Sequence, residues 1–140
     1  MPIRCEIVSQ DRIVYQGDAD SVLIPGAAGE MGILPHHSPV LTTLQFGIVR
    51  VRAGGEDLFF TVAGGVAEVQ PDHVTVLADA AENVQEIDVQ RAEAARARAE
   101  QAIKEGAGKE TDTYQELQMK LRRSNLRLDA VTRFRQRRGG

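Results

Sequence analysis

The chain of 140 residues is long enough for one ordinary domain, or for a small domain with an appendage. Hydrophobic residues make up 42 % of the chain but aromatic residues only 4 %, and tryptophan is absent, so we expect an aliphatic core. The single cysteine, Cys5, excludes an intramolecular disulfide and favours a reducing compartment. We expect Cys5 to be a buried member of a strand and not a nucleophile.

The formal net charge of −3 conceals an asymmetry along the chain. Residues 1–85 contain four arginines, no lysine and eleven acidic residues, whereas residues 86–140 contain 13 basic and nine acidic residues. Residues 120–138 hold eight of the basic residues, opposed only by Asp129. This last segment is cationic, so we expect it to seek an anionic partner.

We expect neither a targeting segment nor a membrane span. The first residues lack the long apolar run of a signal peptide. No segment approaches the roughly 20 apolar residues that a membrane-spanning helix needs. The expected protein is therefore soluble, or peripheral to a membrane.

Residues 1–85 have the pattern of short strands separated by tight turns. Alternating and β-branched runs predict strands at residues 5–8, 12–15, 21–24, 40–44, 48–52, 58–62, 66–70 and 74–77. Turn residues lie between them, such as Gly54-Gly55, Gly64-Gly65 and Pro71-Asp72. Many short strands with regular turns are typical of an all-β sandwich or barrel.

After residue 86, the spacing of apolar residues changes to the period that is typical of helices. Asp88 is suited to be an N-cap, because its carboxylate can accept hydrogen bonds from the first free amides of a helix. Small residues then recur on one face of the predicted first helix: Val89, Ala92, Ala95, Ala99, Ala102 and Ile103. Gly106-Ala107-Gly108 ends this helix and permits a reversal.

The predicted second helix starts with a capping box, Thr113-x-x-Glu116. Larger apolar residues recur at a spacing of three to four and predict an amphipathic seam: Tyr114, Leu117, Leu121, Leu128 and Val131, with Ser124 filling one step.

Residues 29–39 form the most distinctive stretch, with two glycines, two prolines, Glu30 and the pair His36-His37. This composition predicts a stiff, irregular loop. We expect no metal site, because adjacent histidines point apart on an extended chain and only His73 remains as a third ligand. No nucleophile elbow and no Gly-Lys-Ser/Thr phosphate loop occur, so we expect no catalytic residues.

Four motifs in chain order carry a specific resemblance to a known family. They are Gly-Glu-x-Gly-Ile-Leu-Pro-x-His-x-Pro at 29–39, Gly-Gly-Val-Ala-Glu-Val at 64–69, Val-Thr-Val-Leu-Ala at 74–78 and Ile-Asp-x-x-Arg-Ala at 87–92. In this order, over nearly the whole chain, the sequence resembles the epsilon subunit of a bacterial F-type, rotary ATP synthase. One departure is His36, where this family commonly has glycine.

The resemblance implies an N-terminal antiparallel β-sandwich, residues 1–85, followed by a C-terminal antiparallel two-helix hairpin, residues 86–140. The sandwich would bind the gamma subunit and the ring of c subunits, with Glu30 and His37 facing that ring. The hairpin would regulate ATP hydrolysis. In its compact form it would permit hydrolysis, and when extended along gamma it would reach the alpha/beta catalytic ring and obstruct it. The chain would thus be a non-catalytic rotor subunit, peripheral to the cytoplasmic face of the bacterial plasma membrane, requiring no cofactor.

The resemblance also implies a regulatory ATP site. In some members of the family the Ile-Asp-x-x-Arg-Ala motif binds ATP together with arginines of the last helix. The motif and last-helix residues here are Ile87, Asp88, Arg91, Ala92, Arg123 and Arg127; Arg98 joins them because it is seven residues after Arg91 on the same helix face, and Glu82, which precedes the motif, would help. The arginines would bind the phosphates through their planar forks, and Asp88 would accept a hydrogen bond from the adenine amino group. The alternative is a solvated charged helix face, with Asp88 acting only as a cap.

The cationic last helix supports two further interpretations. In the extended hairpin, four arginines would meet an acidic patch near the catalytic beta subunits: Arg122, Arg123, Arg133 and Arg135. The competing class of protein is a nucleic-acid-binding module with residues 120–138 along a phosphate backbone. The acidic first part and the lack of interleaved aromatic residues argue against that class, so we expect no nucleic-acid partner.

Overall fold

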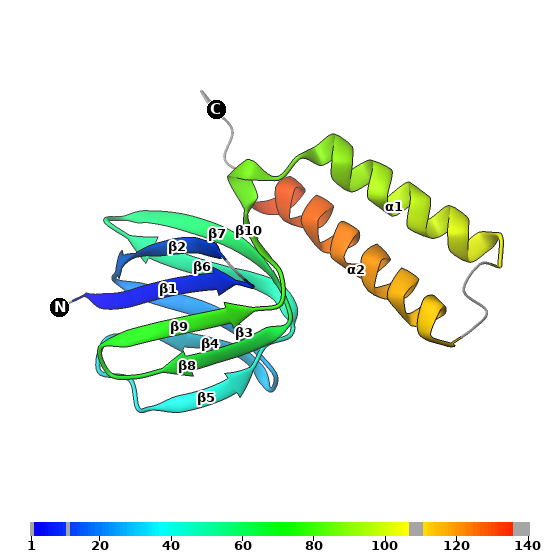
Figure 1. Ribbon diagram of the computed structural model, residues 1–140. Coiled ribbons are helices and arrows are strands. Elements are labelled where there is room, and N and C mark those ends of the chain that lie inside the picture. Colours follow the sequence, from blue (N-terminus) through cyan, green and yellow to red (C-terminus); the bar gives the residue numbers. More distant parts are fainter. Residues whose placement is uncertain (1, 11, 107–110, 136–140) are drawn as a thin grey trace, which may run out of the picture. The chain divides into compact units, whose positions relative to one another are not determined.

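The computed structural model describes residues 2–10, 12–106 and 111–135, with only the backbone of residues 111–113. The chain divides into two compact units, with the boundary between Asn83 and Val84. The sequence predicted this boundary two residues further along. The first unit contains the strands and the second the helices (Figure 1).

Two five-stranded sheets make up the β unit, among the residues that the structure describes. Their strands are β1 (Ile3–Ser9), β2 (Arg12–Ala19), β3 (Ser21–Gly26), β4 (Gly29–Ile33), β5 (Val40–Thr43), β6 (Phe46–Ala53), β7 (Glu56–Ala63), β8 (Gly65–Val69), β9 (His73–Ala78) and β10 (Ala81–Asn83). One sheet has the order β2-β1-β9-β8-β5 and the other β10-β7-β6-β3-β4 (Figure 1). The predicted sandwich is therefore confirmed over the predicted barrel.

Among the described residues, the strand pairs are antiparallel with one exception. β1 and β9 run parallel, with Ile7 opposite Val76, and so join the first strand of the unit to its second-last. A parallel pair needs a long connection, and here all the strands from β2 to β8 lie between the two partners. The predicted sandwich architecture is thus confirmed, but the sequence did not predict that β1 and β9 pair in parallel.

The core between the two sheets is aliphatic, as the composition predicts. Alternate residues of the strands are fully buried, including Ile3, Cys5, Ile7, Val22, Ile24, Val49, Val51, Phe60, Val62, Val74 and Val76. Each buried valine, isoleucine or phenylalanine side chain contributes roughly 1.5–3 kcal/mol when it leaves water. Phe60 is the largest of them and contacts the tilted ring of Tyr15, with 5.4 Å between ring centroids.

Two strands were not predicted from the sequence, β4 and β10. β4 occupies the first half of the stretch that was expected to be an irregular loop, and its residue Ile33 pairs with Val22. Glycine is rare in strands, so Gly29 and Gly32 weaken the sequence pattern that would have predicted β4. The irregular segment is therefore confined to residues 34–39. Within it, His36 has a φ of 69°, the left-handed conformation that favours glycine.

The described part of the helical unit contains a short 3₁₀ turn, Val84–Glu86, and two α-helices, α1 (Val89–Lys104) and α2 (Thr111–Phe134). Asp88 is the N-cap of α1, as predicted. Gly106 follows the C-terminal end of α1 with a φ of 77°, and its N–H donates to the Ile103 carbonyl at 3.1 Å. Ala107 and Gly108, the rest of the predicted turn, lie outside the described residues.

The second helix begins two residues before the predicted capping box. α2 starts at Thr111, so Thr113 lies inside the helix and is not its N-cap. The helices lie side by side and run in opposite directions (Figure 1). Small residues are buried on both, namely Ala92, Ala99, Ser124 and Ala130, which lets the two helix backbones approach closely.

Candidate functional site

A groove between α1 and α2 is the principal candidate site. Nine of the residues that the structure describes line it: Ala95, Arg98, Ala99, Ala102, Leu117, Lys120, Arg123, Ser124 and Arg127. Its volume is about 480 Å³, within the range of roughly 300–1,000 Å³ that is common for small-ligand pockets. The alanines leave the space open, and the long cationic side chains form its polar wall.

The described residues that give this groove its charge are all cationic. Arg98 comes from α1, whereas Lys120, Arg123 and Arg127 come from α2, and no carboxylate is among the described residues that line the groove. Such a groove can bind a ligand that carries several negative charges close together. Guanidinium groups add directed pairs of N–H donors, which match the oxygens of phosphate.

Three of the four arginines predicted for ATP meet in this groove. Arg91 is the fourth; it is exposed in the first turn of α1, seven residues before Arg98 on the same helix face, and does not line the groove. Sequence reasoning missed Lys120, although its spacing to Arg123 and Arg127, three and seven residues, already put it on their face of α2.

The Ile-Asp-x-x-Arg-Ala motif divides into packing and exposed residues. Ile87 and Ala92 are buried, with 4 % and 0 % of their surface exposed. Asp88 is exposed, and its carboxylate accepts a hydrogen bond from the Arg91 backbone N–H at 3.0 Å. Asp88 and Arg91 are therefore the motif residues whose side chains remain accessible to a ligand.

Glu82 lies on β10 and belongs to the β unit, whereas the other predicted ATP-site residues belong to the helical unit. It is paired with Thr61 across the sheet, and its backbone carbonyl accepts a hydrogen bond from the Thr61 hydroxyl at 3.5 Å. Its role toward a nucleotide stays a prediction.

The four arginines predicted for inhibition have different surroundings. Arg123 lines the groove between the helices. Arg133 lies 3.5 Å from Asp129 and stacks over the Phe134 ring, 5.1 Å from its centroid. Arg135 donates hydrogen bonds to backbone carbonyls at the start of the helical unit.

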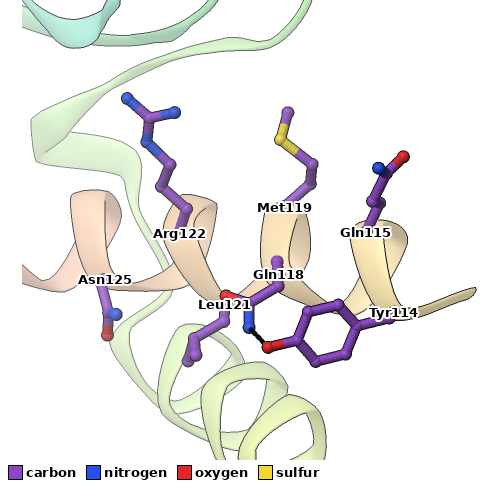
Figure 2. A pocket seen from close by; sticks show the side chains of 7 residues that line it. All are labelled: Tyr114, Gln115, Gln118, Met119, Leu121, Arg122 and Asn125. Atoms are coloured by element: carbon purple, nitrogen blue, oxygen red, sulfur yellow. Dashed lines mark hydrogen bonds between the residues drawn. The ribbon is translucent and has the colours of Figure 1, made fainter. Parts of the chain in front are cut away.

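Arg122 lines a second groove, of about 620 Å³, along α2. Figure 2 shows Arg122, Met119 and Gln115 on one side of the helix and Tyr114 and Leu121 on the other. The Tyr114 hydroxyl accepts a hydrogen bond from the Gln118 amide at 2.7 Å (Figure 2). Tyr114, the first residue of the predicted seam, is 45 % exposed, so it is not covered by packing; Met119, which is not a member of the seam, is 44 % exposed.

Glu30 and His37, the predicted c-ring contacts, lie in different elements. Glu30 is exposed on β4, opposite Pro25 of β3. His37 lies in the following loop and donates from Nδ1 to the Ser38 carbonyl at 2.7 Å. The N–H of His36 donates to the Pro71 carbonyl at 2.8 Å, which ties this loop to the turn between β8 and β9.

A row of apolar side chains crosses the outer face of the sheet β2-β1-β9-β8-β5. Strand register aligns Ile13, Val8, Leu77 and Val66 in that order. Ile13 and Leu77 are 61 % and 49 % exposed. Sequence reasoning did not find this row, because its members come from four strands whose pairing is not encoded locally.

Within the described parts of the chain, no group of three or more potential metal ligands occurs. No helix among the described residues is long and apolar enough to cross a membrane.

Comparison with protein families assigns both units. The β-sandwich domain of the ATP synthase delta/epsilon chain matches residues 2–84, and the long α-helix domain of the same chain matches residues 85–132. The chain therefore belongs to the delta/epsilon chain family of ATP synthase.

Its relatives within this family narrow the assignment. ATP synthase epsilon chains are 41 % identical in Herpetosiphon aurantiacus, covering 94 % of this chain and 95 % of the relative, and 40 % identical in Halalkalibacterium halodurans, covering 94 % and 98 %. In Herminiimonas arsenicoxydans the ATP synthase epsilon chain is 41 % identical, covering 97 % of this chain and 97 % of the relative. A chain of the Euglena gracilis mitochondrial ATP synthase has the same fold, with a TM-score of 0.69 at 22 % identity over 94 % of this chain and 81 % of that one.

Proposed function

We propose that the chain is a non-catalytic rotor subunit in the central stalk of a bacterial ATP synthase. In this proposal the β unit links gamma to the c-ring, and the helical hairpin regulates ATP hydrolysis. The single observation that carries the regulatory part is the cationic groove between α1 and α2, because it exists only while the two helices lie side by side. The subunit would be peripheral to the cytoplasmic face of the plasma membrane, attached through the complex.

The outer face of the sheet β2-β1-β9-β8-β5 is the proposed contact for gamma. Its apolar row, Ile13, Val8, Leu77 and Val66, is the kind of surface that a stable partner covers. Ile13→Asp or Leu77→Asp should then abolish capture by immobilised gamma. Arg12→Asp, at an exposed neighbour of Ile13, is the matched control and should leave capture intact. Glu30 and His37 are the proposed contacts for the c-ring.

ATP is the proposed ligand of the groove. Its triphosphate carries the clustered negative charge that Arg98, Arg123 and Arg127 match, and Lys120 adds a fourth cation. Arg91 and Asp88 would reach the same ligand from the first turn of α1, with Asp88 accepting from the adenine amino group. Glu82, on β10 of the β unit, is the remaining residue proposed to contact ATP.

Binding of ATP would act on the position of the hairpin. A ligand that binds only the compact hairpin stabilises it by about 2.7 kcal/mol when present at a hundredfold excess over its Kd. Low ATP would therefore release the helices. The extended hairpin would then reach the alpha/beta ring through Arg122, Arg123, Arg133 and Arg135 and stop wasteful hydrolysis.

Isothermal titration of the isolated chain with ATP tests this proposal. Arg98→Ala and Arg127→Ala should each weaken ATP binding roughly ten- to a hundredfold, the usual range for hydrogen bonds to a charged group. Arg96→Ala is the control, because Arg96 lies on the same helix but pairs with Glu100 at 3.6 Å and does not line the groove. Absence of binding at millimolar ATP, or equal losses in all three variants, would contradict an ATP site in the groove.

A further inference from the structure

The side chain of Arg135 joins the two ends of the helical unit. Its Nη2 atom donates to the Val84 carbonyl at 2.8 Å and to the Ile87 carbonyl at 2.7 Å, and its Nε atom donates to the Val84 carbonyl at 3.3 Å. Arg135 directly follows α2, whereas Val84 and Ile87 precede α1. The contact therefore spans about fifty residues of sequence within one unit.

The two carbonyls need an external donor. In a longer α1, the Ile87 carbonyl would accept from the Arg91 N–H, but that N–H is bound to the Asp88 carboxylate at 3.0 Å. Apart from Arg135, the donor that the described residues provide for the Val84 carbonyl is the Ile87 N–H, at a long 3.4 Å. Val84 and Ile87 are themselves buried, with 1 % and 4 % exposed, so water cannot easily supply the missing donors.

This contact can form only in the compact hairpin. α2 has 24 residues and is about 36 Å long, so turning it away from α1 carries Arg135 far from Val84. The same contact holds α2 in the register that brings Arg123 and Arg127 opposite Arg98. Arg135 does not line the groove, so any effect on a ligand there acts through the position of the helix.

We propose that Arg135 is a positioning residue that latches the compact hairpin through the Val84 and Ile87 carbonyls and thereby preorganises the groove for ATP. The coupling to ATP rests on the function proposed above, but the latch does not. The latch also makes two roles of Arg135 mutually exclusive. While its guanidinium is bound to these carbonyls, it is withdrawn from the alpha/beta ring, and opening of the hairpin releases the cation and the inhibitory helix together.

Distances between two spin labels on the full chain, without nucleotide, test the latch directly. Labels at Glu86→Cys and Thr132→Cys occupy exposed positions near the two ends of the contact. Native Cys5 is fully buried and should stay unlabelled. The parent and Arg133→Ala should give one short distance, and Arg135→Ala a broad distribution extending to long distances. An unchanged short distance in Arg135→Ala would overturn the latch.

ATP titration of the same variants tests the coupling. Arg135→Ala should bind ATP roughly tenfold more weakly than the parent, Arg135→Lys should lie between them, and Arg133→Ala should match the parent. Equal affinities in the parent and Arg135→Ala would overturn the coupling. A parent that binds no ATP would refute the proposed ATP site, and the label distances would still decide the latch. Circular dichroism checks that α2 remains helical; if Arg135→Ala loses helix, the distances in Arg135→Lys decide.

Discussion

The carboxylate of Asp88 accepts a hydrogen bond from the backbone N–H of Arg91, at 3.0 Å, and so caps α1. Asp88 has an extended backbone, with φ −82° and ψ 102°, as an N-cap requires. One carboxylate oxygen is used in this bond. The cap and a contact to the adenine of ATP are therefore compatible, and the two roles need to be separated by experiment.

Substitution of Asp88 by serine or alanine separates capping from ligand binding. Serine also caps helices, so Asp88→Ser should leave the stability of the hairpin nearly unchanged, whereas Asp88→Ala should cost about 1 kcal/mol. If Asp88 contacts the base, both variants should lose ATP affinity, because the serine hydroxyl is shorter and uncharged. Chemical unfolding and ATP titration measure the two effects. Full ATP affinity in Asp88→Ser would leave Asp88 as a cap alone.

A glycine at position 36 should stabilise the β unit. His36 has a left-handed φ of 69°, a conformation that costs a residue with a Cβ atom roughly 1–2 kcal/mol. Glycine removes that cost but gains freedom in the unfolded chain, so His36→Gly should add up to about 1 kcal/mol to the free energy of unfolding. His36→Val, β-branched, should lower it. Thermal unfolding of the parent, His36→Gly and His36→Val ranks their stabilities. A His36→Gly variant less stable than the parent would show that the His36 side chain makes a compensating contact.

The features that sequence reasoning found are those with local causes. The N-cap at Asp88 and the end of α1 before Gly106 depend on neighbouring residues alone. The arginine spacing on each helix likewise follows from the helical period, so the meeting of Arg98, Arg123 and Arg127 in one groove needed only an antiparallel hairpin.

The features that it missed depend on distant partners. β10 has three residues and exists because Glu82 pairs with Thr61 of β7. The apolar row on the outer sheet depends on the parallel pairing of β1 with β9, which sets Val8 beside Leu77. The bonds from Arg135 to the Val84 and Ile87 carbonyls join residues 51 and 48 positions apart. No local pattern encodes such pairs.

Removal of residues 84–140 should leave a folded β unit. Its core, including Phe60, Val62 and Ile7, comes from its own strands, so a fragment of residues 1–83 should unfold cooperatively on heating. Within the complex, the same truncation should preserve capture by gamma and ATP-driven proton pumping while relieving inhibition of hydrolysis. Aggregation of the fragment, or loss of its binding to gamma, would contradict this division of labour.

Burial should make Cys5 unreactive and the stability of the β unit dependent on alkaline pH. Desolvation, with a smaller effect of Glu6, raises the pKa of the Cys5 thiol from 9.0 to about 12. The folded protein therefore keeps this proton while the unfolded chain releases it above pH 9.0. The Cys5 contribution to stability is complete below that pH and falls by about 1.4 kcal/mol per pH unit above it, until the folded pKa is reached.

Urea unfolding at several alkaline pH values measures this effect, with Cys5→Ala as the control that lacks it. In the native protein at neutral pH, alkylation of Cys5 should occur only as fast as the β unit opens. Rapid alkylation of the folded protein would show that the Cys5 thiol is not protected by burial. The same alkaline loss of stability in Cys5→Ala would show that the Cys5 thiol does not cause that loss.

Exposed arginines of α2 should contribute to inhibition by charge. Arg122 and Arg133 do not line the groove, so the double change Arg122→Ala/Arg133→Ala removes two cations without altering the proposed ATP site or the Arg135 contact. In the reconstituted complex at low ATP, this variant should raise ATP hydrolysis relative to the parent and to Arg96→Ala. The difference should shrink as salt increases, because the Debye length is already only about 8 Å at physiological ionic strength. Unchanged hydrolysis, with cross-linking proof that the hairpin is extended, would remove these charges from the inhibitory mechanism.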